Sequence, residues 1–256
     1  MIDLHCHVLP GIDDGPETIE NSLELARTAL AAGIGTLVAT PHVNARTPND
    51  AATIARLVGV VNQRLAEEQV DLQVVAGAEI AITQLAEIEP AELSRLGLGG
   101  GRWLLVEPPF SLVAPGLADI VLGLQREGHS VVLAHPERCP ALHRDRSVVP
   151  TLAEAGVLMS ITAGSLVGRF GGEVRRYALE LARDELVHNV TSDAHDSVQR
   201  PPGLADALDQ AGLAPLADWL TREVPAAILS GAQIPRRPEG AAVAVPRARR
   251  RWGLRR

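Results

Sequence analysis

Histidine and acidic residues at metal-ligand spacing open this sequence. His5 and His7 flank Cys6, and Asp13-Asp14-Gly15 follows a few positions later. Residues two apart on a short strand point to the same face, so His5 and His7 can present both imidazoles to one metal ion while Cys6 points away. The pattern predicts that this first segment belongs to a metal site.

Apolar runs alternate with helical patterns along the chain, which is typical of parallel βα units. We expect seven strands, at 2–7, 36–42, 72–79, 103–107, 130–135, 157–162 and 189–193, and helices at 16–32, 50–68, 116–127, 149–155, 172–185 and 203–213. Six of the seven runs end on His, Asp or Glu, and catalytic groups of a parallel barrel collect at such carboxyl ends. A lone histidine there is usually structural, but six agreeing strand ends favour one shared site.

The residue types indicate which chemistry such a site would perform. The candidate ligands are His5, His7, Asp14, His42, Glu79, Glu107, His135, Asp193 and His195. Imidazole and carboxylate groups suit zinc, manganese or iron, and three or four of them satisfy one metal. Nine ligands therefore indicate a multinuclear centre with a bridging carboxylate. Neighbouring divalent metals activate a bridging water and bind the oxygens of a displacement at phosphorus, so we expect phosphoester hydrolysis.

Two arginines follow these ligands closely. The guanidinium groups of Arg138 and Arg200 could bind phosphate oxygens and balance charge in the transition state. The simpler alternative is that they pair with acids such as Glu137 or Asp196. Arg169 stands in a glycine-rich segment, 164–171, which could line the substrate mouth or merely connect two elements. We predict catalytic roles for Arg138 and Arg200 and leave Arg169 open.

The two cysteines are expected to be reduced thiols without a catalytic role. Thiol-dependent phosphatases need an arginine six positions after the cysteine, in the loop that binds the phosphate. That position holds Ile12 after Cys6 and Asp145 after Cys139. We predict that serine at either cysteine keeps most of the turnover, whereas His42→Ala or Asp193→Asn abolishes it.

Length and charge divide the chain unevenly. The 256 residues, 46% of them hydrophobic, fit one catalytic domain over 1–235. Residues 236–256 hold eight arginines and one acid, a charge of +7, against −14 for residues 1–235. This tail is expected to be a disordered basic extension that could contact anionic surfaces, without a specific nucleic acid partner. Neither a secretory signal nor a membrane-spanning apolar run is recognised, so we expect a cytoplasmic location.

Seven motifs occur in order over about residues 1–210: HCHVLPGIDDGP from His5, ATPH from Ala39, GAEI from Gly77, LLVEPP from Leu104, AHPER from Ala134, ITAGSLVGRFG from Ile161 and SDAH from Ser192. Together they resemble the bacterial manganese-dependent protein-tyrosine phosphatases of the polymerase-and-histidinol-phosphatase superfamily, of the CpsB/CapC/YwqE type. The resemblance implies an α/β fold, a distorted seven-stranded (β/α) barrel similar to a TIM barrel, with three divalent metal ions. These would usually be manganese, with iron or zinc as alternatives.

The resemblance also implies a role for each candidate residue. One metal would take His5, His7, Glu79 and Asp193, a second would share Glu79 and add Glu107 and His135, and a third would take Asp14, His42 and His195. Arg138 and Arg200 match the phosphate-binding arginines, and a metal-activated hydroxide would attack the phosphotyrosine phosphorus. The implied substrate is a phosphotyrosine protein, an autophosphorylating bacterial tyrosine kinase that governs capsular or exopolysaccharide synthesis.

Two positions depart from the pattern of these phosphatases. Cys139 follows the HPER motif where an aromatic residue is usual, and Pro108 follows Glu107 where phenylalanine is usual. With 2% aromatic residues in the chain, we expect few rings in the pocket to stack on phosphotyrosine. Two alternatives stay open: a phosphoesterase for a small phosphate such as histidinol phosphate, and an inactive scaffold that binds phosphotyrosine. A scaffold should have lost a ligand or an arginine, and none is missing.

Overall fold

The computed structural model describes residues 1–239 as an alternation of strands and helices. The strands are β1 Ile2–Cys6, β2 Thr36–Ala39, β3 His42–Val43, β4 Gln73–Ala76, β5 Glu79–Ala81, β6 Trp103–Glu107, β7 Ser130–Ala134, β8 Leu158–Thr162 and β9 Asn189–Thr191. The α-helices are α1 Ile19–Ala31, α2 Ala51–Glu67, α3 Pro90–Arg95, α4 Leu117–Arg126, α5 Pro140–Arg144, α6 Val148–Glu154, α7 Ala163–Leu166, α8 Gly172–Arg183, α9 Ala205–Gln210 and α10 Val224–Ser230. Tighter 3-10 turns are η1 Ile82–Glu87, η2 Leu98–Gly100, η3 Pro136–Arg138 and η4 Ala214–Leu216, and η5 Trp219–Glu223 is a π-helical turn.

The strands form two parallel sheets, with the orders β1-β2-β4 and β3-β5-β6-β7-β8-β9. All seven expected runs contain a strand, but two runs are split, because β3 follows β2 after Pro41 and β5 follows β4 after Gly77. At the first break, Pro41 has no N–H to donate to a neighbouring strand. At the second, the chain packs so closely that a Cβ at Gly77 would lie 2.9 Å from Val38 Cγ1. Between β1 and the segment after β9 there is an isolated bridge, Cys6 to Ala194. Within the described residues the strands thus form two parallel sheets with nine strands in total, and a single closed barrel of seven strands is not seen.

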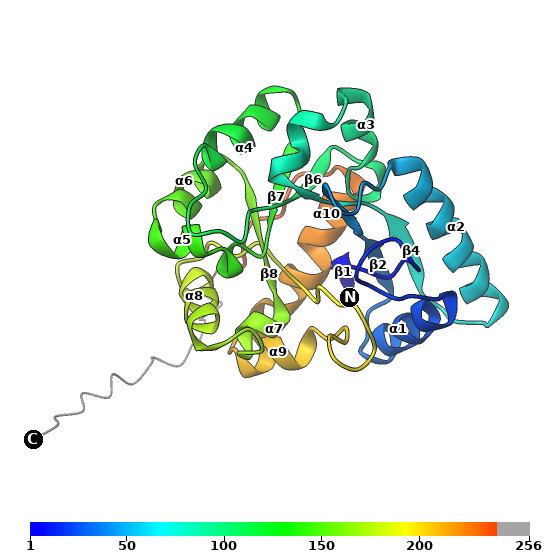
Figure 1. Ribbon diagram of the computed structural model, residues 1–256. Helices are drawn as coiled ribbons and strands as arrows, with labels where there is room; N and C mark the ends of the chain where they lie inside the picture. Colours follow the sequence, from blue (N-terminus) through cyan, green and yellow to red (C-terminus); the bar gives the residue numbers. More distant parts are fainter. Residues whose placement is uncertain (240–256) are drawn as a thin grey trace, which may run out of the picture.

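Helices surround the strands on the outside of the molecule (Figure 1). α10 instead lies within this ring in the view, where it packs against β1 and against η2, which precedes β6. Because η2 stands at the amino end of β6, α10 covers the ends of the strands opposite to their carboxyl ends. The carboxyl ends remain available for a site.

The six expected helices are all present as α1, α2, α4, α6, α8 and α9, with slightly different bounds. α2 illustrates why such a segment forms a helix. Asp50 caps it by accepting from the Thr53 N–H, and Ile54, Val61 and Leu65 face the core. The sequence reading missed α3, α5, α7 and α10, which have at most seven residues and give little periodicity. The glycine-rich segment 164–171 is therefore not a loop throughout, because its first residues belong to α7.

The expected tail begins at residue 236, and its first residues are described. The Trp219 indole donates to the Pro235 carbonyl at 3.1 Å, and the Arg237 side chain, 15% exposed, lies 3.7 Å from Glu185. Residues 240–256, which contain the rest of the expected tail, lie outside the described residues. Within residues 1–239 no helix has the length and apolar character needed to cross a membrane.

Candidate metal centre

All nine expected ligands lie together, at the carboxyl ends of strands or, for His42 and Glu79, at the first residues of β3 and β5. They come from β1 and the segment after it (His5, His7, Asp14), from β3, β5 and β6 (His42, Glu79, Glu107), and from the residues after β7 and β9 (His135, Asp193, His195). Their donor atoms form four overlapping groups, each within 4.8 Å: His7, Asp14, His42 and His195; His5, His7 and Asp193; His5, Glu79 and His135; and His42, Glu79 and Glu107. The strands thus gather residues from across the chain into one cluster.

The middle of the cluster is built on His5 of β1 and on His7, which directly follows the strand. The Nε2 atoms of His5 and His7 lie 3.2 Å apart. Glu79 Oε2 is 3.3 Å from His5 Nε2 and 3.4 Å from His7 Nε2, and Asp193 Oδ1 is 3.5 Å from each. Leu4 and Cys6, on the other face of β1, are fully buried in the core. The alternation of the strand therefore directs both imidazoles into the site, as expected.

Glu79 also reaches the other groups of donors. Its Oε1 atom lies 2.7 Å from His135 Nε2, and its Oε2 atom lies 2.9 Å from His42 Nδ1. Glu107 Oε1 is 3.8 Å from His135 Nε2. Since its two oxygens face different imidazoles, Glu79 is placed as a bridging carboxylate would be.

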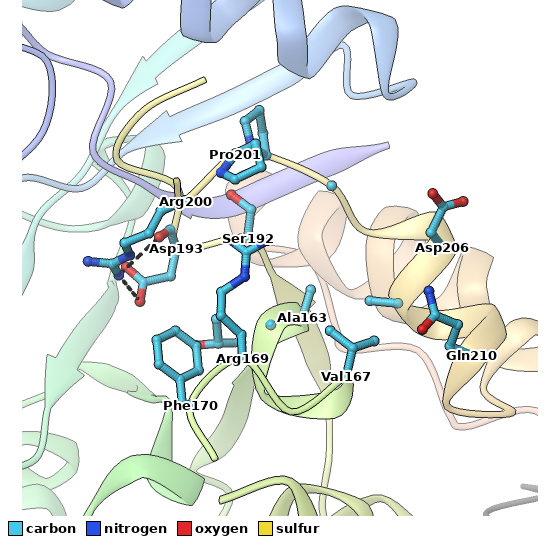
Figure 2. Close-up of a pocket in the computed structure, with 15 residues that line it drawn as sticks. Ala163, Val167, Arg169, Phe170, Ser192, Asp193, Arg200, Pro201, Asp206 and Gln210 are labelled. Atoms are coloured by element: carbon cyan, nitrogen blue, oxygen red, sulfur yellow. Dashed lines mark hydrogen bonds and ion pairs between the residues drawn. The ribbon is translucent and has the colours of Figure 1, made fainter. Parts of the chain in front are cut away.

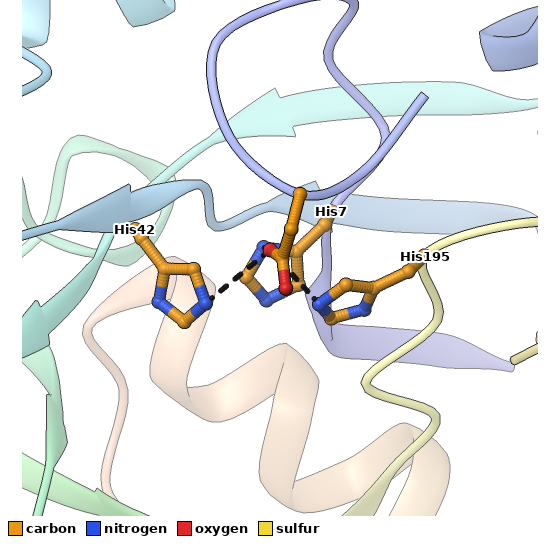
Figure 3. A group of neighbouring side chains, drawn as sticks. His7, His42 and His195 are labelled. Carbon is orange, nitrogen blue, oxygen red and sulfur yellow. Dashed lines mark ion pairs between the residues drawn. The ribbon is translucent and has the colours of Figure 1, made fainter. Parts of the chain in front are cut away.

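A third set of donors surrounds Asp14. Its Oδ1 atom is 3.2 Å from His195 Nε2, 3.4 Å from His42 Nε2 and 4.0 Å from His7 Nδ1. Figure 3 shows the three imidazoles turned toward one another from separate strand ends. Asp14 is 61% exposed, so this part of the cluster opens to solvent.

Two ligand candidates have an unusual backbone. His135 and Asp193 have positive φ angles, 30° and 52°, in the left-handed region that non-glycine residues seldom adopt. His135 directly follows β7 and Asp193 stands two residues after β9, and the turns point their side chains back into the cluster. Such conformations concentrate at functional sites.

The ligands predicted from the sequence do not include Asp13, whose carboxylate contacts the Nδ1 atom of His7. Asp13 Oδ2 lies 2.7 Å from His7 Nδ1 and accepts from the His42 N–H, while its Oδ1 accepts from the Gly15 N–H. A carboxylate on the second nitrogen of a metal-bound histidine fixes its tautomer and orientation. The signal was present as the doubled aspartate, but sequence alone did not show which one faces His7.

Arg138 and Arg200 meet at a single carboxylate. Arg138 donates to Asp193 Oδ2 at 2.5 Å, and Arg200 donates to the same atom at 2.7 Å. Both arginines therefore pair with an acid, as the simpler alternative expects, but this acid is Asp193. Glu137 instead accepts from Ser165 Oγ, and Asp196 accepts from the Arg200 backbone N–H. The two arginines thus border the cluster of donors.

A cavity of about 290 Å³ begins beside Asp193 and Arg200 (Figure 2). Arg169 and Phe170 line it, and Arg169 donates to the Gln199 carbonyl at 2.6 Å. Of the two roles considered for the segment 164–171, the structure therefore supports the lining of a cavity next to the cluster. A second cavity, of about 340 Å³, is lined by Glu107 and Phe110.

The charges of the cluster perturb one another strongly. Burial alone would lower the pKa of His7, but the carboxylates of Asp13, Asp193 and Glu79 raise it well above its ordinary value. Burial, with the nearby charge of Glu79, raises the pKa of Glu107 to about 7. Imidazoles and carboxylates therefore compete for protons here, and a divalent cation would replace those protons.

The donors fit a divalent transition-metal ion. They are imidazole nitrogens and carboxylate oxygens without a thiolate. His42 Nδ1 and Glu79 Oε2 are buried without a hydrogen-bond partner, and they face each other at 2.9 Å. Buried lone pairs that converge without a donor are what a cation would satisfy.

Known proteins resemble this chain in sequence and in structure. Residues 1–212 match the family described as "Capsular polysaccharide synthesis, CpsB/CapC". The tyrosine-protein phosphatase YwqE of Bacillus subtilis is 38% identical over 77% of this chain and 78% of its own length. The tyrosine-protein phosphatase CpsB of Streptococcus pneumoniae is 31% identical over 82% and 88%.

A solved structure is similar over almost the whole fold. It is described as "Crystal structures of YwqE from Bacillus subtilis and CpsB from Streptococcus pneumoniae, unique metal-dependent tyrosine phosphatases". The TM-score is 0.83 at 33% identity, over 93% of this chain and 98% of the other. A histidinol phosphate phosphatase of Lactococcus lactis reaches a TM-score of 0.53 at 12% identity, over 86% and 95%, which is a likeness of fold alone.

Proposed function

This chain belongs to the CpsB/CapC family of capsular polysaccharide synthesis, and from that premise we propose that it is a metal-dependent protein-tyrosine phosphatase. One observation of the site carries the proposal: nine metal-ligand side chains converge beside two arginines that could bind a phosphate. The reaction is the hydrolysis of a phosphate monoester, in which the bond from phosphorus to the tyrosyl oxygen breaks and water supplies the new oxygen.

We propose three divalent ions, with manganese first and iron or zinc as alternatives. His5, His7, Glu79 and Asp193 would hold one, Glu79, Glu107 and His135 a second, and Asp14, His42 and His195 a third. The four donor groups support this division in part, because they contain all nine residues and place Glu79 between sets. They also bring His5 to His135 and His7 to Asp14, so neighbouring ions would share more donors than the resemblance implies.

Bound ions would activate a water molecule and neutralise charge on the phosphate. The protein's own residues do the rest. Arg138 and Arg200, both anchored on Asp193, orient their remaining N–H groups toward the non-bridging phosphate oxygens and balance the charge that grows during displacement. Asp13 keeps the His7 ring in place. The tyrosyl oxygen leaves as a phenolate, which takes up a proton.

We also propose that the two sheets together act as a distorted barrel. β2 with β3 and β4 with β5 each continue one run across the sheets, and the Cys6–Ala194 bridge joins the remaining pair of edges. The natural substrate would be an autophosphorylating tyrosine kinase that regulates polysaccharide synthesis, and the enzyme would act in the cytoplasm, where ATP-dependent phosphorylation takes place.

Metal-stripped protein should be assayed with and without added Mn²⁺ on a phosphotyrosine peptide and on histidinol phosphate, with Asp193→Asn as the blank. Manganese-dependent turnover of the peptide is expected. Preference for histidinol phosphate would keep the metal centre and overturn the substrate. Absence of turnover on both, with phosphopeptide binding retained, would indicate the scaffold.

A further inference from the structure

The chain has only two phenylalanines, and both lie against the same guanidinium. Arg138 Cζ is 4.4 Å from the centre of the Phe170 ring and 5.1 Å from the centre of the Phe110 ring. Phe110 follows β6 and Phe170 follows α7, so two distant segments bring them together. The pocket thus has few rings, as expected, but both phenylalanines of the chain lie at this site.

Phe110 touches the metal cluster as well as the arginine. Its ring stacks on the His135 imidazole at 5.5 Å between centres and 23° between planes. The backbone before it is restrained, because Pro108 and Pro109 fix two φ angles and Cys139 Sγ donates to the Pro109 carbonyl at 3.2 Å. The position of the ring beside the site is therefore built into the fold.

Despite this contact, Phe110 is 53% exposed, and it lines the cavity that also includes Glu107. Phe170 is more buried. The guanidinium of Arg138 lies over its ring, and a Cβ at Gly164 would lie 3.2 Å from its edge. Phe110 thus has ring surface free for a ligand beside Glu107, while Phe170 lies closer to the arginine and lines the cavity beside Asp193 and Arg200.

We propose that Phe110 is a specificity-determining residue whose exposed ring packs against the aryl group of the substrate and selects aryl over alkyl phosphate monoesters. The inference rests on the proposed function. Only the ester oxygen separates the phosphorus from the aryl ring, so a phosphate held by Arg138 places that ring next to Phe110. Offset or edge-to-face contact between two aromatic rings is favourable beyond the apolar area it buries.

A purely supporting role for Phe110 predicts something different. If its ring only held Arg138 by a cation–π contact, replacing it would weaken the binding of every phosphate equally. A contact with the substrate ring would weaken aryl ligands alone. Phe170, whose ring lies against the same guanidinium, offers a matched control for this distinction.

The test compares Phe110→Leu, Phe110→Tyr and Phe170→Leu in the manganese-loaded enzyme, with Val60→Ala on the outer surface of α2 as a reference. Inhibition constants are measured for phenylphosphonate and methylphosphonate, and kcat/KM for matched phosphotyrosine and phosphoserine peptides. Metal content and thermal unfolding confirm that each variant is folded and loaded.

We expect Phe110→Leu to raise the inhibition constant of phenylphosphonate by about three- to tenfold and to leave that of methylphosphonate nearly unchanged. Phe110→Tyr should retain the aryl preference, and Phe170→Leu should affect both phosphonates in the same proportion. Equal losses for both phosphonates in Phe110→Leu, or no loss, would overturn the inference. If the wild-type enzyme with manganese hydrolyses no phosphotyrosine peptide, the proposed function fails first and the inference with it.

Discussion

The imidazole of His7 stands at the meeting point of two donor groups, so its orientation matters to more than one ion. Asp13 is 2.7 Å behind its Nδ1 atom and also accepts from the His42 N–H. Asp13→Asn keeps the shape but loses the charge and one acceptor. We expect the affinity for Mn²⁺ to fall by about 10- to 100-fold, the usual effect of removing such a partner. Titration of metal-stripped protein measures this directly.

Asp119→Asn, at an exposed position in the first turn of α4, is the control for this change. It alters the net charge of the protein equally but belongs to none of the four donor groups. If both variants lose the same affinity, the effect of Asp13 is one of overall charge and its contact with His7 is unimportant.

Both cysteines are excluded as nucleophiles by their surroundings. Cys6 is fully buried and Cys139 is 1% exposed, and burial raises the pKa of each thiol, for Cys6 well above its ordinary value. Neither is a thiolate at neutral pH. We expect Cys6→Ser and Cys139→Ser to keep most turnover, since a serine hydroxyl can still donate to the Pro109 carbonyl. Loss of activity in both variants, with metal content unchanged, would contradict the metal mechanism.

Between β8 and β9, a neutral histidine connects neighbouring strands. His188 Nδ1 accepts from the Met159 N–H at 3.1 Å, and burial lowers the pKa of His188 to about 4. In the unfolded chain this histidine is protonated below about pH 6.5, so between pH 6.5 and 4 the unfolded state binds more protons. The stability that depends on neutral His188 is therefore present above pH 6.5 and is lost as the pH falls toward 4.

His188→Asn tests this at the level of the two strands, because an amide oxygen can accept the same bond without titrating. Between pH 7 and pH 4.5 we expect the wild type to lose about 2 kcal/mol more of its unfolding free energy than the variant. Urea unfolding with EDTA present keeps bound ions out of the comparison. Parallel pH profiles for the two proteins would show that His188 does not contribute.

The elements show what sequence patterns can and cannot predict. β6 has its expected bounds, since an apolar run ending on Glu107 leaves little ambiguity. The breaks at Pro41 and Gly77 were missed because they interrupt ladders without interrupting the apolar pattern. The helix α7 was missed because a single turn carries no period. The helix α10 was missed because it is short, follows a π-helical turn and has proline as its second residue.

For the site, residue type and strand position predicted which side chains gather, but not how they pair. Strand ends placed His135 and Asp193 correctly because carboxyl ends of parallel strands meet. Sequence gave no reason for both arginines to choose Asp193, since that pairing depends on turns with positive φ after β7 and β9. The same limit hid Phe110 and Phe170, whose shared contact with Arg138 is purely tertiary.

Across the whole molecule, the metal centre lies where the two sheets meet. His5 belongs to the sheet of β1, β2 and β4, while His42, Glu79 and Glu107 belong to the other sheet. A bound ion would therefore connect two sheets that, within residues 1–239, are joined by the isolated bridge between Cys6 and Ala194. It would also relieve the repulsion among clustered carboxylates.

We expect ion binding to stabilise the fold as a unit. A ligand at about 100 times its Kd adds about 2.7 kcal/mol, which for a domain of this size raises the melting temperature by about 5–10 °C. Calorimetry of metal-stripped protein with increasing Mn²⁺ should show one transition that moves upward with concentration. Asp193→Asn should blunt the shift, while Asp119→Asn should not. An unchanged melting temperature in the wild type at saturating Mn²⁺ would mean that the ions do not join the sheets, even if they support turnover.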